Sequence, residues 1–174
     1  KIDKTLLKKL KLPENIIALT WSRGKGSTTA IIRKIFEEQG YTVCHNDSGA
    51  NLVSGITTTL INHSNLKGEI KEDIIILEVD ERYSSILFKS INPQTLVITN
   101  ICRDQPPRQG NVDLVFDKIN QVITKNMTLI INGDDPYLRK FQLQNNENKI
   151  IYYGIEKNKY SYNKELFKNL NMYY

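Results

Sequence analysis

The stretch from Ile16 to Gln39 constrains the fold of this chain more than any other. It holds an apolar run at residues 16–20, a short basic turn with two glycines, and a helix-type pattern at residues 30–39. A glycine turn between a strand and a helix lets backbone N–H groups and the helix N-terminus face an anion. The stretch predicts a strand, a phosphate-binding turn and a helix, although a plain glycine turn would give the same pattern.

Within this turn, Lys25 is the candidate phosphate ligand, and the hydroxyl of Ser27 or Thr28 is the candidate Mg2+ ligand. The turn departs from the Walker consensus at two positions. Leu19 stands where that consensus has its first glycine, and Gly26 separates the lysine from the hydroxyl residues. The remaining candidate nucleotide contacts of the turn are Arg23, Gly24 and Gly26, with Arg23 open to a second interpretation as a surface charge.

The composition is that of one globular domain. The chain has 174 residues, 40% of them hydrophobic and 25% charged, which is enough to bury a core without disulfides. The net charge of +5 comes from dispersed lysines, so nucleic-acid binding is not expected.

Cys44 and Cys102 lie far apart among apolar residues and are predicted to be buried thiols. With neither a signal peptide nor an apolar run of membrane-spanning length, we expect a cytoplasmic fragment without a transmembrane segment.

Apolar strand patterns alternate with helical patterns along the chain. This alternation predicts an α/β fold with a doubly wound, mostly parallel sheet. We expect a domain at residues 1–156 and a polar, tyrosine-rich tail at 157–174. The predicted strands are residues 16–20, 41–44, 74–81, 95–99, 127–131 and 150–153, and the predicted helical segments are 1–12, 30–39, 57–61, 112–124 and 137–143.

Polar residues follow several of these strands, where ligands bind in such sheets. Glu78 is the candidate metal ligand, with a structural ion pair to a base such as Arg103 as the alternative. Asn132 is a candidate nucleotide contact or a turn residue, and Asp135 is a further candidate contact. Four other polar residues are open to two interpretations: Asp80 and Glu81 as site carboxylates or helix caps, and Asn46 and Asn51 as phosphate-loop residues or partners of backbone groups.

Five ordered segments resemble the central domain of the Mur-ligase family. They are residues 20–29, 46–56, 78–81, 99–105 and 132–136. The Glu-Val-Asp-Glu sequence at 78–81 and the Arg-Asp-Gln sequence at 103–105 are similar to the branch of the family that forms the ATP-binding subunits of lipid II isoglutaminyl synthases.

This resemblance implies a ligase that uses ATP and Mg2+ to activate a carboxylate as an acyl phosphate. In that branch the carboxylate belongs to D-glutamate of the lipid II stem peptide, and ammonia comes from a GatD-like glutamine amidotransferase subunit. By resemblance, Lys25 would hold the β- and γ-phosphates, Ser27 or Thr28 and Glu78 would reach Mg2+, and Asn132 would contact adenine. Such an enzyme works in the cytoplasm, where its substrate lies at the inner face of the membrane.

The sequence differs from the family pattern at informative positions. Trp21 replaces the first glycine of the family loop, and residues 106–110 replace a segment that carries a further carboxylate. The four-cysteine zinc ribbon and the C-terminal domain of the family have no counterpart before Tyr174, so we expect the fragment alone not to catalyse amidation. Two alternatives stay open: a degenerate domain with a scaffold role, and a ligase of the folylpolyglutamate or poly-γ-glutamate synthase type.

Overall fold

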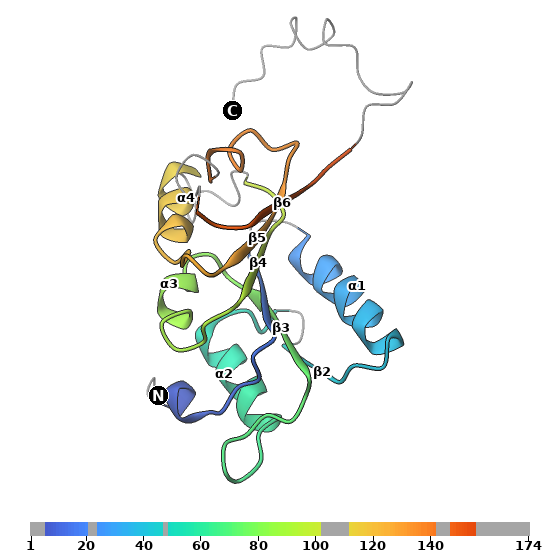
Figure 1. Cartoon of the computed structure of the whole chain (residues 1–174). Helices are drawn as coiled ribbons and strands as arrows, with labels where there is room; N and C mark the ends of the chain where they lie inside the picture. The colour runs from blue at the N-terminus through green and yellow to red at the C-terminus, as the bar shows by residue number, and fades with distance from the viewer. Residues whose placement is uncertain (1–5, 21–23, 47–48, 102–111, 142–146, 156–174) are drawn as a thin grey trace, which may run out of the picture.

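The computed structural model describes residues 6–20, 24–46, 49–101, 112–141 and 147–155 of the chain. Strands and helices alternate through most of this part (Figure 1). The elements are η1 (Leu6–Lys9), β1 (Ile16–Thr20), α1 (Lys25–Glu38), β2 (Val43–His45), α2 (Val53–Asn62), β3 (Ile74–Val79), α3 (Ser84–Leu87), β4 (Thr95–Ile98), α4 (Val112–Asn120), β5 (Thr128–Asn132) and β6 (Ile150–Tyr153).

The six strands form one sheet in the order β2-β3-β1-β4-β5-β6. Every neighbouring pair is parallel. The predicted doubly wound α/β sheet is therefore confirmed, and within the described part of the chain it is parallel throughout. None of the helices among the described residues has the length and apolar character of a membrane span.

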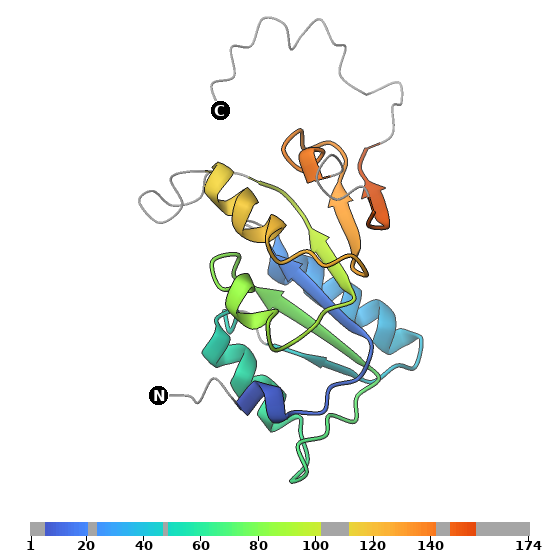
Figure 2. The same ribbon diagram turned by 60° about the vertical axis from the view of Figure 1, so that its left-hand side comes forward.

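The strand order determines which face each helix covers. The connection from β1 to β2 passes over β3 in one direction along the sheet, whereas the later connections all run in the other direction. Because parallel crossovers are right-handed, helices on oppositely directed connections lie on opposite faces. Figures 1 and 2 agree with this rule, since α1 lies on one face and α2, α3 and α4 lie on the other.

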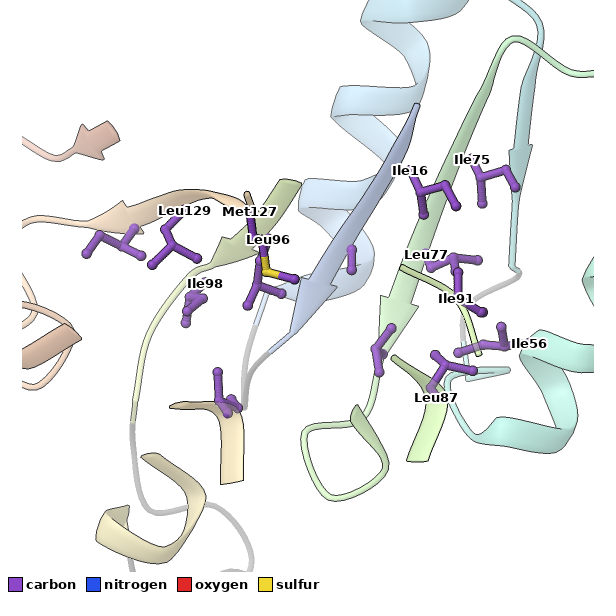
Figure 3. Packing of buried hydrophobic residues seen from close by; sticks show 14 of the residues in the cluster. Ile16, Ile56, Ile75, Leu77, Leu87, Ile91, Leu96, Ile98, Met127 and Leu129 are labelled. Atoms are coloured by element: carbon purple, nitrogen blue, oxygen red, sulfur yellow. The ribbon is translucent and has the colours of Figure 1, made fainter. Parts of the chain in front are cut away.

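Each face of the sheet has its own apolar cluster, as the alternation of side chains along a strand requires. On the face of α2 to α4, Ile75 and Leu77 of β3 belong to one large cluster with Ile56 and Leu87 (Figure 3). On the face of α1, the smaller buried cluster contains Leu19, Ile74, Ile76 and Val97. Full burial of such a side chain contributes about 1.5–3 kcal/mol, so the larger cluster carries most of the stability.

The bounds of β1 and β6 agree with the sequence prediction, while several helix bounds do not. Helix α1 begins at Lys25 and not near residue 30, because Gly24 adopts φ of 80° and turns the chain directly into the helix. Helix α2 begins at Val53, four residues before its predicted start, and ends at Asn62. Of the helix predicted for residues 137–143, residues 137–139 form turns, and only Lys140 and Phe141 are helical before the described part is interrupted.

The N-terminal helix predicted for residues 1–12 is reduced to η1, a short 3-10 helix, in the described part. Strand β2 starts at Val43, later than predicted, since Thr42 is held by Asp73 through its backbone N–H and its hydroxyl. Cys44 is fully buried, as predicted, and burial raises the pKa of its thiol to about 12. Cys102 lies outside the described residues.

Candidate functional site

The carboxyl end of β1 is the point where the winding of the sheet reverses. The chain leaves β1 toward the face of α1, while its neighbours β3 and β4 lead to α3 and α4 on the other face. In open parallel sheets, ligands bind outside the strand ends at such a point. Thr20 of β1 lies in register with Val79 of β3 and Ile98 of β4, so the residues that follow these three strands meet at one edge.

The N-terminal turn of α1 lies at this edge. The first intrahelical hydrogen bond runs from the Thr28 N–H to the Gly24 carbonyl at 3.0 Å, so the N–H groups before Thr28 have no partner within the helix. The turn holds no acidic residue, which suits an anion at the helix N-terminus. Ser27 is exposed and Thr28 is half-buried, and neither hydroxyl forms a hydrogen bond with any described residue.

Three buried carboxylates lie at the carboxyl end of β3, one within the strand and two directly after it. Glu78, Asp80 and Glu81 are 7%, 8% and 2% exposed. The Glu81 carboxylate accepts from Lys25 Nζ at 3.5 Å, across 56 residues of sequence. The structure therefore brings the predicted phosphate ligand and the predicted acidic cluster into direct contact.

Asp80 forms a bidentate ion pair with Arg82. Its carboxylate accepts from Arg82 Nε at 2.9 Å and from Nη2 at 2.5 Å. Burial alone would raise the pKa of Asp80, but the hydrogen bonds and charge of Arg82, with a further contribution from Lys25, hold that pKa below its ordinary value. Asp80 is therefore ionised and already neutralised by a neighbouring cation.

Glu78 is the carboxylate of this cluster without a cationic partner among the described residues. Its Oε1 accepts a hydrogen bond from the Asn51 amide at 3.3 Å, and no lysine or arginine in the described part lies within ion-pair distance. A buried carboxylate with only an amide partner is costly unless a cation balances it. The residues present fit Mg2+, which is held by one or two carboxylates together with phosphate oxygens and water.

Asn46 has a structural role at the same edge. Its side chain accepts from the Glu78 N–H at 2.8 Å and donates to the Glu78 carbonyl at 2.9 Å and to the Ala50 carbonyl at 3.0 Å. The side chain is 3% exposed and so satisfies backbone groups, the second of its two predicted roles. The Asn51 backbone carbonyl accepts from the Asp80 N–H at 3.0 Å, and its side-chain amide donates to Glu78. The predicted role of Asn51 at the phosphates stays a prediction.

Asn132 and Asp135 lie where β5 ends, two strands from β1 and thus about 10 Å away. Both side chains shape the local turn. The Asn132 Oδ1 accepts from the Asp134 N–H at 2.9 Å, and the Asp135 carboxylate accepts from the N–H groups of Ile101 and Tyr137 at 2.8 and 2.9 Å. Asp135 thus ties the loop after β4 to the turn after β5, and both Asn132 and Asp135 line a cavity of about 260 Å³.

A larger cavity of about 650 Å³ lies beside this turn, at the outer edge of the sheet. Tyr152 and Tyr153 of β6 contribute to its lining and are each 42% exposed. The Gly154 backbone approaches Asp134 so closely that an added Cβ would lie 2.8 Å from a carboxylate oxygen. The sequence analysis did not identify this cavity, because no local pattern brings β6 next to the turn after β5.

Several predicted site residues lie outside the described part of the chain. Arg23 and Trp21 of the turn after β1 belong to this group, and so do residues 103–105. Their predicted roles stay predictions.

The family is established by sequence comparison. Residues 19–173 match the Mur ligase middle domain family, and the chain belongs to it. The predicted domain boundary at residue 156 stays a prediction.

The chain is similar to MurT, the subunit of lipid II isoglutaminyl synthase (glutamine-hydrolyzing). It is 30% identical to the protein of Staphylococcus aureus strain COL over 158 residues, which cover 90% of this chain and 35% of that protein. It is 35% identical to the protein of Streptococcus pneumoniae strain R6, covering 88% of this chain and 34% of that protein. The chain thus spans about a third of the length of these relatives.

Solved structures of Mur ligases share the fold. The MurF ligase of Thermotoga maritima in complex with ADP superposes with a TM-score of 0.72 at 19% identity, over 88% of this chain and 35% of that one. A bifunctional folylpolyglutamate synthase/dihydrofolate synthase with Mn, AMPPNP and L-glutamate bound gives a TM-score of 0.59 at 16% identity, over 87% of this chain and 46% of that one.

Proposed function

We propose that this chain is the ATP-binding central domain of a MurT-like subunit of lipid II isoglutaminyl synthase. The observation that carries the proposal is the position of Glu78. It is a buried carboxylate without a cationic partner in the described part, at the strand edge where Lys25 and the N-terminus of α1 meet. The negative phosphates of a nucleotide would suit Lys25 and the N-terminus of α1, and the positive charge of Mg2+ would balance the Glu78 carboxylate.

The proposed roles follow the geometry. Lys25 and the first N–H groups of α1, with the backbone at Gly24 and Gly26, hold the phosphates. Glu78, oriented by Asn51, holds Mg2+ together with the Ser27 or Thr28 hydroxyl. The Asn132 side chain contacts the base, and Asp135 positions the loops around it. Bound Mg2+ neutralises developing charge on the phosphates, and the chain's own part is binding and orientation.

In the whole protein, the proposed reaction is an amidation. The D-glutamate carboxylate of the lipid II stem peptide receives the γ-phosphoryl group of ATP and becomes an acyl phosphate. Ammonia from a GatD-like glutamine amidotransferase subunit then attacks the acyl carbon, and phosphate leaves. The product is a D-isoglutamine residue in the stem peptide. The sequence similarity to MurT supports this reaction over that of a folylpolyglutamate synthase, for which only the fold is shared.

The test uses the full-length protein with its amidotransferase subunit, glutamine, ATP, Mg2+ and lipid II. Mass spectrometry of the stem peptide measures amidation. We expect conversion by the wild type and none by Lys25→Ala, while Lys34→Ala, which removes an exposed lysine of the same helix, retains activity. Nucleotide binding without amidation would support a different acceptor, and an absence of nucleotide binding would favour the scaffold role.

A further inference from the structure

The ion pair between Lys25 and Glu81 is buried at the proposed phosphate site. The side chains are 11% and 3% exposed, and Nζ lies 3.5 Å from Oε2. Solvent and salt screen such a pair far less than an exposed one. The positive charge of Lys25, which the phosphates would contact, is therefore already paired with the Glu81 carboxylate.

The charge balance around this pair is negative. Glu78, Asp80 and Glu81 bring three carboxylates, while Lys25 and Arg82 bring the two cations that the described residues place against them. One negative charge remains on the described part of the site. A metal-free nucleotide would add several more, and at a poorly screened site that repulsion is strong.

We propose that Glu81 is a specificity-determining residue that makes nucleotide binding depend on a divalent cation. Its carboxylate competes with the phosphates for Lys25 and keeps the described part of the site negative. The site therefore rejects the free nucleotide and accepts the metal–nucleotide complex. This inference rests on the proposed nucleotide-binding function.

Glu81 carries this role because of its partner. Asp80 is engaged by the Arg82 guanidinium, and Glu78 faces the Asn51 amide. Glu81 is the carboxylate whose partner is the phosphate-binding lysine itself. Helix α1 offers a matched control in the pair Lys34–Glu38, which has an N···O distance of 2.7 Å and side chains that are both 66% exposed.

The test is calorimetric titration of the chain with ADP, in EDTA and again in excess Mg2+. For the wild type we expect Mg2+ to tighten ADP binding substantially. In Glu81→Gln we expect metal-free ADP to bind roughly tenfold more tightly than in the wild type, with the effect of Mg2+ reduced by a similar factor. Glu38→Gln should behave as the wild type.

A second variant separates charge from packing. Glu81→Asp keeps the carboxylate, so it should keep the weak metal-free binding, whereas general disruption of the loop would affect both variants alike. Equal or weaker metal-free binding by Glu81→Gln, in a protein that circular dichroism shows to be folded, would overturn the inference while leaving the proposed function intact. A wild type that binds no ADP even with Mg2+ would overturn both.

Discussion

The side chain of Asn46 bridges the backbone of Glu78, accepting from its N–H at 2.8 Å and donating to its carbonyl at 2.9 Å. The bridge continues the ladder between β2 and β3 past His45, the last residue of β2. It holds Glu78 in place beyond the point where the backbone pairing of β3 with β2 ends. The position of the proposed metal ligand thus depends on a buried amide of a neighbouring loop.

Replacing this amide should destabilise the protein. In Asn46→Ala, the N–H and C=O of Glu78 lose their partner in a buried environment. We expect the free energy of unfolding to fall by about 2–4 kcal/mol. Urea denaturation measures this change, and Asn62→Ala, at an exposed position near the end of α2, is the control that should change little. Equal stability of the two variants would contradict the bridging role.

Replacing Glu78 should have opposite effects on stability and binding. Glu78→Gln removes a buried charge that has only an amide partner, so the metal-free protein should be as stable as the wild type or more stable. Its affinity for an ATP analogue with Mg2+ should fall at least about tenfold, equivalent to ~1.4 kcal/mol. Thermal unfolding and calorimetric titration measure the two quantities, with the exposed Glu14→Gln as control. Lost stability with retained affinity would refute this interpretation of Glu78.

A third prediction concerns Gly55 in the first turn of α2. An alanine in a helix ordinarily stabilises by about 1 kcal/mol relative to glycine. Here an added Cβ would lie 2.7 Å from the Ala50 carbonyl oxygen, so the loop that carries Asn51 would have to move. We expect Gly55→Ala to lose about 1–3 kcal/mol of stability and to bind nucleotide more weakly. Ser54→Ala, one residue away and exposed, should do neither; a stabilised Gly55→Ala would exclude the close contact.

The pH dependence of stability should include a contribution from Asp73. Its carboxylate accepts from the Thr42 hydroxyl and N–H at 2.7 and 2.8 Å, and these bonds lower its pKa from the ordinary 3.8. A depressed native pKa stabilises the fold above the unfolded pKa, and this contribution disappears as the pH falls through the native value. The Tm difference between wild type and Asp73→Asn should thus be constant above about pH 5 and shrink below about pH 4. A difference that does not change with pH would argue against this linkage.

Much of the fold could be predicted because its strands are short apolar runs ended by polar residues. The run from Ile16 to Thr20 gave the bounds of β1, and the acidic residues after Val79 marked the edge of the sheet where the candidate site lies. The start of α1 was wrong because it depends on the left-handed conformation of Gly24, which composition alone does not reveal. A prediction from helical periodicity starts a helix at its first apolar residues, whereas the structure starts it where the backbone first adopts the helical conformation.

The contacts within the candidate site could not be predicted in the same way. Lys25 and Glu81 lie 56 residues apart, and Asn46 and Glu78 lie 32 residues apart. Each pair meets only because β3 inserts between β1 and β2 in the sheet. The sequence identified the residue types that suit the chemistry, whereas the strand order determined which of them became partners.

The central claim is that Lys25 and Glu78 form a Mg2+-dependent nucleotide site, and thermal unfolding tests it most directly. With Mg2+ and a non-hydrolysable ATP analogue at 100 times its Kd, binding should add about 2.7 kcal/mol, which raises the Tm by roughly 5–10 °C. We expect this shift in the wild type and in Lys34→Ala, and no shift in Lys25→Ala. No shift in the wild type at millimolar ligand, or an equal shift in Lys25→Ala, would contradict the account.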